Sequence, residues 1–85
     1  MPESPTAAVT LYVVPNCPLC ANARVWLARH RIAFVKRDVK RDFGALRDMY
    51  RLTRQNLVPV FALGERALVR PTDKQLEEFL VNGEA

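Results

Sequence analysis

The pattern of apolar and polar positions first indicates strands. Four segments are short, rich in β-branched and aromatic residues, and bounded by turn-forming residues. They are VTLYVV (9–14), IAFVKRDV (32–39), LVPVFAL (57–63) and RALV (66–69). Gly64 supplies a turn between the last two and predicts a β-hairpin. In the second segment, Ile32, Phe34 and Val35 are the candidates to face inward.

Three other segments repeat apolar residues at helical intervals. They are PLCANARVWLARHR (18–31), DFGALRDMYRLT (42–53) and TDKQLEEFLV (72–81). Their expected inward stripes are Leu19, Ala23, Trp26 and Leu27 in the first, Phe43, Leu46, Met49 and Tyr50 in the second, and Leu76, Phe79 and Leu80 in the third. Asp42 is the expected N-cap of the second helix, Thr72 with Gln75 has capping-box spacing, and Gly83 is placed to end the last helix.

The resulting order is β-α-β-α-β-β-α, which predicts an α/β fold with a four-stranded mixed sheet flanked by helices. Residues 9–85 are expected to form one domain, preceded by a flexible arm, MPESPTAA, at residues 1–8. Sites in such sheets gather at the carboxyl ends of strands. Cys17 follows the first strand directly and therefore occupies a position suited to chemistry.

Composition narrows the class of protein. The chain has 85 residues, 49% hydrophobic and 26% charged, which is ordinary for one globular domain and excludes a disordered chain. No apolar run approaches the roughly 20 residues of a membrane span, and no secretory signal is visible, so we expect a cytoplasmic protein without membrane contact. We further expect it to be a monomer. The net charge is +4, but the basic residues are scattered, so nucleic acid is not an expected partner.

Both cysteines of the chain lie in the motif CPLC (17–20). A disulfide staple is disfavoured in the reducing cytosol, and zinc needs four ligands. His30 is the one further candidate ligand, and it lies more than about 15 Å from Cys20 along the same helix. We therefore expect no metal site. A redox pair and two cysteines that merely pack in the core both remain compatible with the motif.

The local geometry favours the redox pair. With Pro18 as the first helical residue, Cys17 becomes the N-cap and Cys20 the third residue of the helix. The Cys17 sulfur would then accept backbone N–H donors, including that of Cys20, at the positive end of the helix dipole. Both effects favour the thiolate form of Cys17, the species that attacks disulfides. Cys20 is expected to be more buried and to resolve the mixed disulfide.

The segments LYVVPNCPLC and NLVPVF, followed by a hairpin and a helix, resemble the glutaredoxin family across nearly the whole chain. The resemblance implies a thioredoxin-like fold and reduction of disulfides by dithiol exchange through Cys17 and Cys20, with Pro18 and Leu19 contacting substrate from within the motif. It further implies a cis bond between Val58 and Pro59 facing Cys17, with the Val58 backbone pairing with substrate as an added strand. The exchange needs no tightly bound cofactor.

Three departures weaken the resemblance to glutathione-using members. Val14 replaces the lysine that usually precedes the first cysteine by three positions, and Leu57 replaces a threonine. LVRPTDKQL stands where the family usually has Gly-Gly-Cys-Asp-Asp. Its VRP also resembles the glutaredoxin-like hydrogen donor of ribonucleotide reductase, which has an aromatic residue in place of Val69 and is recharged by thioredoxin reductase.

The resemblance thus implies disulfide-containing proteins as substrates, with ribonucleotide reductase as one candidate. It implies either glutathione or a thioredoxin-reductase-type flavoenzyme as the reductant. From the residues themselves, Arg70 is a candidate to bind a carboxylate of glutathione or of a protein partner. The helix amides that follow Thr72 are candidates to receive an anionic group.

Two other classes remain as alternatives. Some glutaredoxins hold an iron–sulfur cluster between two subunits, using the first cysteine and glutathione. The intact Cys20 and the departures from the glutathione signature argue against a cluster. The other class is a redox-inert module that uses the fold for protein contacts.

Overall fold

The computed structural model describes the backbone of residues 9–82 and the side chains of residues 9–80. Two sequence-based expectations, the flexible arm at residues 1–8 and the helix stop at Gly83, lie outside the described residues.

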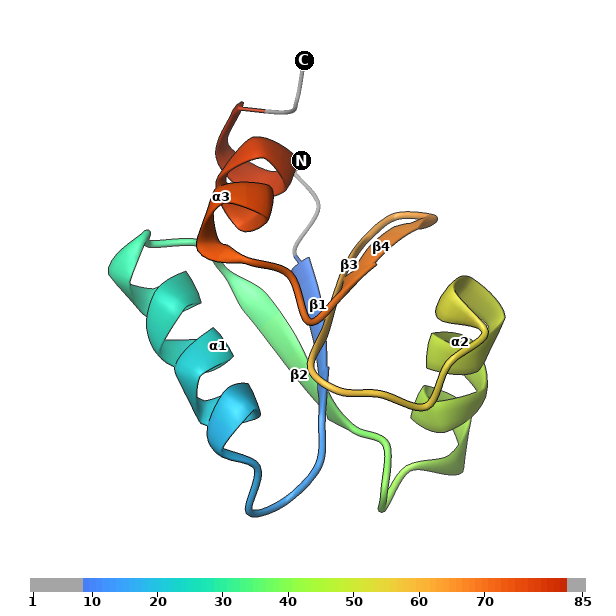
Figure 1. The fold of residues 1–85 in the computed structure, drawn as a ribbon. Coiled ribbons are helices and arrows are strands. Elements are labelled where there is room, and N and C mark those ends of the chain that lie inside the picture. Colours follow the sequence, from blue (N-terminus) through green and yellow to red (C-terminus); the bar gives the residue numbers. More distant parts are fainter. Residues whose placement is uncertain (1–8, 83–85) are drawn as a thin grey trace, which may run out of the picture.

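A four-stranded mixed sheet forms the centre of the molecule (Figure 1). Its strands are β1 (Val9–Val13), β2 (Phe34–Asp38), β3 (Val60–Leu63) and β4 (Arg66–Val69), in the spatial order β2-β1-β3-β4. β1 pairs parallel with β2 and antiparallel with β3, and β3 and β4 form the expected hairpin. The turn between them has Gly64 at a φ of 64°, which glycine adopts without steric cost.

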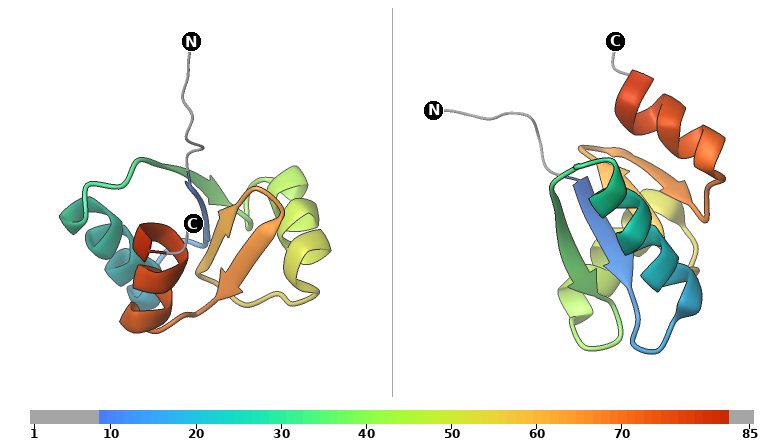
Figure 2. Two further views of the ribbon diagram at one scale, coloured as in Figure 1. Left: turned by 90° about the horizontal axis from the view of Figure 1, so that it is seen from above. Right: turned by 90° about the vertical axis from the view of Figure 1, so that its left-hand side faces the viewer.

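The helices cover both faces of this sheet. They are α1 (Pro18–Arg29), α2 (Phe43–Thr53) and α3 (Asp73–Leu76), the last of which continues into a π-helical segment, η1 (Glu77–Asn82). Figure 2 shows α1 and α3 on one face and α2 alone on the other. The predicted α/β fold, with its order β-α-β-α-β-β-α, is confirmed.

The core joins the sheet to the helices through large side chains from different elements. Leu11 of β1, Phe61 of β3, Leu27 of α1 and Met49 of α2 are all fully buried. Leu76 and Phe79, from the predicted stripe of the last helix, are also buried. Each helix therefore contributes apolar side chains to the interior, which is the main source of stability for so small a domain.

Several side chains predicted to face inward are exposed. Phe43 is 83% exposed because the buried face of α2 carries Ala45 and Met49, whereas Phe43 lies on a different face together with Tyr50, seven residues later. Val35 is 54% exposed because it lies on β2, an outermost strand of the sheet, which has a neighbouring strand on one side only. Leu19 and Tyr50 are exposed as well. The inward placement predicted for these four side chains is wrong.

Three strands are shorter than the pattern predicted, and the first of them, β1, ends at Val13 and leaves Val14 outside. Residues 32, 33 and 39 lie outside β2, and β3 begins at Val60 rather than at residue 57. Pro59 lacks the N–H that a strand needs for its ladder, which accounts for the later start of β3.

Helix caps and one cross-element ion pair complete the framework. The Asp42 carboxylate accepts a hydrogen bond from the Ala45 N–H at 3.1 Å, and Thr72 and Gln75 form both bonds of a capping box. Both predicted caps are confirmed. Arg37 of β2 donates to Asp48 of α2 at 2.8 Å, and this hydrogen bond lowers the pKa of the Asp48 carboxyl. The loop between β2 and α2 is thus held at both ends.

Leu27→Ala should lower the free energy of unfolding by roughly 2–5 kcal/mol, because it removes a fully buried side chain of α1 and leaves a cavity. Val25 lies on the same helix and is 53% exposed, so Val25→Ala should change stability by no more than about 0.5 kcal/mol. Urea unfolding followed by circular dichroism measures both variants. Equal destabilisation of the two would contradict this assignment of the core.

Candidate active site

The connection from β1 to α1 brings Cys17 to the carboxyl end of the first strand. Pro15 and Asn16 form a turn, and Asn16 has a φ of 59°, a left-handed conformation that Asn tolerates better than most residues. Cys17 then takes an extended backbone as N-cap of α1, with Pro18 in the first turn of the helix. This placement confirms the geometry expected from the sequence.

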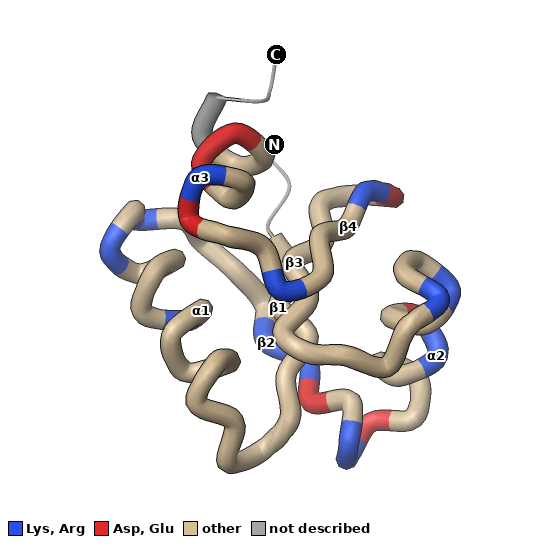
Figure 3. The backbone as a smooth tube through the Cα atoms, in the orientation of Figure 1, with Lys and Arg blue, Asp and Glu red and all other residues tan. Residues whose placement is uncertain are grey.

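The two cysteines contact each other through the first turn of α1. The backbone N–H of Cys20 donates to the Cys17 sulfur at 3.1 Å. The first turns of α1 carry no acidic residue, so no carboxylate of the helix opposes negative charge on that sulfur (Figure 3). Cys17 is half-buried and remains accessible, whereas Cys20 is fully buried. The difference in burial that the sequence predicted is confirmed.

Burial also separates the two thiols chemically. Removal from water raises the pKa of Cys20 to about 11, and a side-chain hydrogen bond with Cys17 adds to that rise. Cys20 is therefore a thiol at neutral pH while the protein is reduced. Cys17 is the sulfur that a substrate can reach first.

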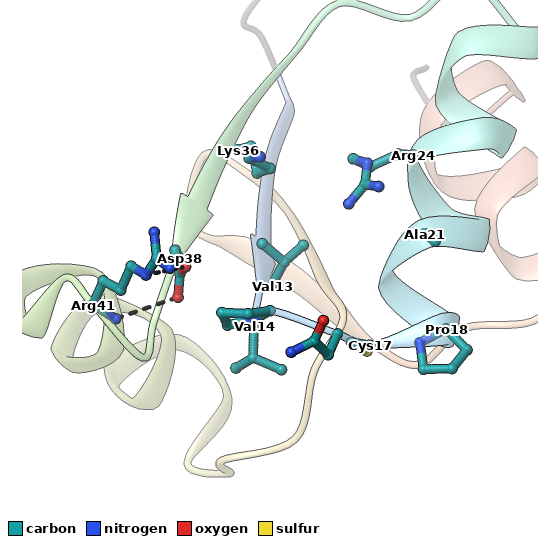
Figure 4. A pocket seen from close by; sticks show the side chains of 11 residues that line it. Val13, Val14, Cys17, Pro18, Ala21, Arg24, Lys36, Asp38 and Arg41 are labelled. Atoms are coloured by element: carbon teal, nitrogen blue, oxygen red, sulfur yellow. Dashed lines mark hydrogen bonds and ion pairs between the residues drawn. The ribbon is translucent and has the colours of Figure 1, made fainter.

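Two hollows flank the CPLC motif. One, of about 550 Å³, is lined by Cys17, Arg24, Lys36, Asp38 and Arg41 together with apolar side chains, and is called the basic hollow below (Figure 4). The other, of about 220 Å³, is lined by Leu19, Trp26, Pro59 and Arg70 among others, and is called the proline groove. Cys17 and Pro18 thus face one hollow, and Leu19 faces the other.

The segment at Val58 and Pro59 is held by Arg70. The bond between Val58 and Pro59 is cis, as the resemblance implied. The Arg70 Nε donates to the Val58 carbonyl at 2.7 Å, and the Arg70 N–H donates to the Pro59 carbonyl at 3.0 Å. These bonds hold Arg70 at a φ of 48°, which is unusual for a residue with a side chain. Part of the guanidinium is therefore already engaged, and binding of a carboxylate by Arg70 stays a prediction.

Thr72 is exposed, and its sequence neighbours Pro71 and Asp73 line the proline groove, but Thr72 itself does not. Its hydroxyl accepts the Gln75 N–H at 3.1 Å within the capping box. An anion-binding role for the amides after Thr72 stays a prediction.

The sequence analysis missed the four charged residues of the basic hollow. A helical signal was present for Arg24, because Cys17, Ala21 and Arg24 follow one another at intervals of four and three residues along one face of α1. Lys36 and Asp38 depend on the parallel pairing of β1 with β2, which places Val13 opposite Asp38. That register depends on tertiary structure, and no local sequence motif predicts it.

Among residues 9–80, no three His, Cys, Asp or Glu side chains gather closely enough to hold a metal ion. In the same described part of the chain, no helix is both long and apolar enough to cross a bilayer.

The mixed sheet with the order β2-β1-β3-β4, covered by α1 and α3 on one face and α2 on the other, is a thioredoxin-like fold, and its CxxC pair lies at the start of α1. Residues 9–68 match the family model of glutaredoxin, and the chain belongs to the glutaredoxin family. Membership of this family indicates thiol oxidoreductase chemistry in general.

Solved structures agree with this fold. The glutaredoxin grx-1 from Archaeoglobus fulgidus has a TM-score of 0.80 at 18% identity, covering 89% of this chain and 88% of that one. The thioredoxin-like protein BC3987 has a TM-score of 0.78 at 21% identity, covering 85% of this chain and 99% of that one.

Curated relatives match over a short stretch. Thirty-one residues are 52% identical to the global transcriptional regulator Spx of Bacillus subtilis, which is 36% of this chain and 24% of that protein. Spx 1 of Oceanobacillus iheyensis is 48% identical over the same length. The matched stretch thus spans about a quarter of these relatives.

Stability should fall as the pH rises from about 9 towards 11. In this window the unfolded chain loses the Cys20 proton while the folded protein, with the pKa raised to about 11, keeps it. The contribution is complete below the unfolded pKa and is lost as the pH passes through the folded one. Urea unfolding under reducing conditions should show a decline of up to roughly 1.4 kcal/mol per pH unit.

Cys20→Ala should remove this part of the decline, whereas Cys17→Ser keeps the Cys20 thiol and should retain most of it. Wild-type and Cys20→Ala stabilities that fall in parallel over this range would contradict the burial argument.

Proposed function

We propose that this protein is a dithiol–disulfide oxidoreductase in which Cys17 attacks and Cys20 resolves. The observation that carries the proposal is the cysteine pair itself. The accessible Cys17 sulfur at the N-cap accepts a hydrogen bond of 3.1 Å from the backbone N–H of Cys20, whose side chain is fully buried. The family match supports thiol chemistry, and the sheet places the pair at the carboxyl end of β1.

The exchange takes two steps. The Cys17 thiolate attacks one sulfur of the substrate disulfide, a mixed disulfide forms, and the first substrate sulfur leaves and takes up a proton. Cys20 then gives up its proton and attacks the Cys17 sulfur, which releases the second substrate thiol. Two electrons pass from the protein dithiol to the substrate, and the protein is left with a Cys17–Cys20 disulfide.

Substrate contacts come from both flanks of the motif. Pro18 and Leu19 border the two hollows, and Pro59 lines the proline groove beside Leu19. The Val58 backbone is the proposed partner of an extended substrate segment. The Val58 carbonyl already accepts a hydrogen bond from the Arg70 Nε. An N–H of the substrate therefore either uses the second lone pair of that oxygen or displaces the arginine.

Cys17→Ser should abolish reduction of a model disulfide, because the hydroxyl does not replace the attacking sulfur. Cys20→Ser should still complete the first step and should accumulate a mixed disulfide with Cys17, visible by mass spectrometry as an adduct that dithiothreitol removes. Full activity of Cys17→Ser would exclude the proposed mechanism.

The reductant is the second part of the proposal and has two candidates, glutathione and a thioredoxin-reductase-type flavoenzyme. Loss of NADPH absorbance is followed with the oxidised protein plus either glutathione with glutathione reductase, or thioredoxin reductase alone. Because Val14, Leu57 and VRP depart from the glutathione signature, we expect faster turnover with thioredoxin reductase. Faster turnover with glutathione would reverse this assignment while leaving the exchange mechanism intact.

A further inference from the structure

The basic hollow lies on the side of the CPLC motif away from the proline groove. Among the described residues the two hollows have no lining residue in common. In Figure 4 the basic hollow opens between α1 and the end of β2, with Cys17 at its edge. A group attached to the substrate next to the attacked sulfur would enter this space, and the part of the substrate across the motif would lie in the proline groove.

The charge of the basic hollow is uneven. Three cations line it, Arg24 from α1, Lys36 from β2 and Arg41 from the segment after β2, against the single carboxylate of Asp38. Arg41 Nε lies 3.7 Å from the Asp38 carboxylate, which also accepts the N–H of Lys40 at 2.9 Å. Neither Arg24 nor Lys36 forms an ion pair with another residue of the described chain.

Arg24 and Lys36 reach from different elements toward the space between them (Figure 4). Val13 and Val14 also line the hollow, so the two cationic groups lie beside apolar side chains. The Arg24 charge also acts on the cysteine pair, since it lowers the pKa of Cys20 against the larger effect of burial. A volume of about 550 Å³ is within the usual range for ligand sites.

We propose that the basic hollow selects disulfides that carry a carboxylate beside the attacked sulfur. Arg24 and Lys36 bind that carboxylate while Cys17 attacks, and Arg41 stays paired with Asp38. This inference rests on the proposed function and names the substrate class of the same site. The carboxylate takes part in no bond change, and the electrons pass between sulfurs as described above.

The test uses single-turnover reduction by the pre-reduced full-length protein, so that no recharging system is needed. The substrates are two disulfide-linked peptide dimers, one with Glu and the other with Gln on both sides of its cysteine. The second-order rate constant for release of peptide thiol is measured after an alkylating quench. We expect the Glu peptide to react about 3- to 10-fold faster at low salt, with the ratio falling as salt is raised.

Charge-matched double variants separate the hollow from the overall charge of the protein. Arg24→Gln with Lys36→Gln should bring the Glu-to-Gln ratio close to one. Arg29→Gln with Lys40→Gln removes two exposed cations from α1 and the β2–α2 loop without touching the hollow, and should keep the ratio within about twofold of wild type. Circular dichroism confirms that both proteins are folded.

Each outcome decides the inference. A wild-type ratio near one, or an equal loss of preference in both double variants, overturns it while disulfide reduction itself stands. Failure of the wild type to cleave either peptide overturns the proposed function as well.

Oxidised glutathione, which also carries carboxylates, is the second substrate to be tested. A parallel loss of its reduction in Arg24→Gln with Lys36→Gln identifies a small molecule as a source of the carboxylate, and an unchanged rate restricts the source to peptides.

Discussion

The hydrogen bond from the Cys20 amide to the Cys17 sulfur is the interaction on which the site depends. It exists because Cys17 ends the turn after β1 and Pro18 begins the helix without needing an N–H of its own. The same turn of α1 carries the Cys20 side chain into the core next to Ala23 and Leu27. One local geometry therefore exposes one sulfur and buries the other, and the proposed order of attack and resolution follows from this difference.

The features that the sequence predicted well are those with local causes. The N-cap at Cys17, the cap at Asp42 and the capping box at Thr72 each depend on residues within one helical turn. The turn at Gly64 likewise follows from a single residue. The helical periodicity correctly predicted that Leu27 and Met49 are buried.

The features that the sequence predicted badly depend on tertiary placement. Phe43 fits an apolar repeat of α2, but the face that packs against the sheet is the one that carries Ala45 and Met49. The charged residues of the basic hollow come from α1, β2 and the segment after β2, and they meet only because β1 and β2 pair in parallel with a particular register. The bond from the Arg70 Nε to the Val58 carbonyl, twelve residues earlier, is likewise a tertiary contact that the sequence did not predict.

Because β2 lies at the edge of the sheet, Lys36 has a second role. An outermost strand has backbone groups that another chain can pair with, and a lysine there discourages such stacking because its charge would have to be desolvated. Val35, beside it, is exposed and apolar, which makes the neighbouring charge more valuable. The proposed recognition of a carboxylate and the protection of the strand edge therefore depend on the same ammonium group, and a neutral residue at position 36 would remove both.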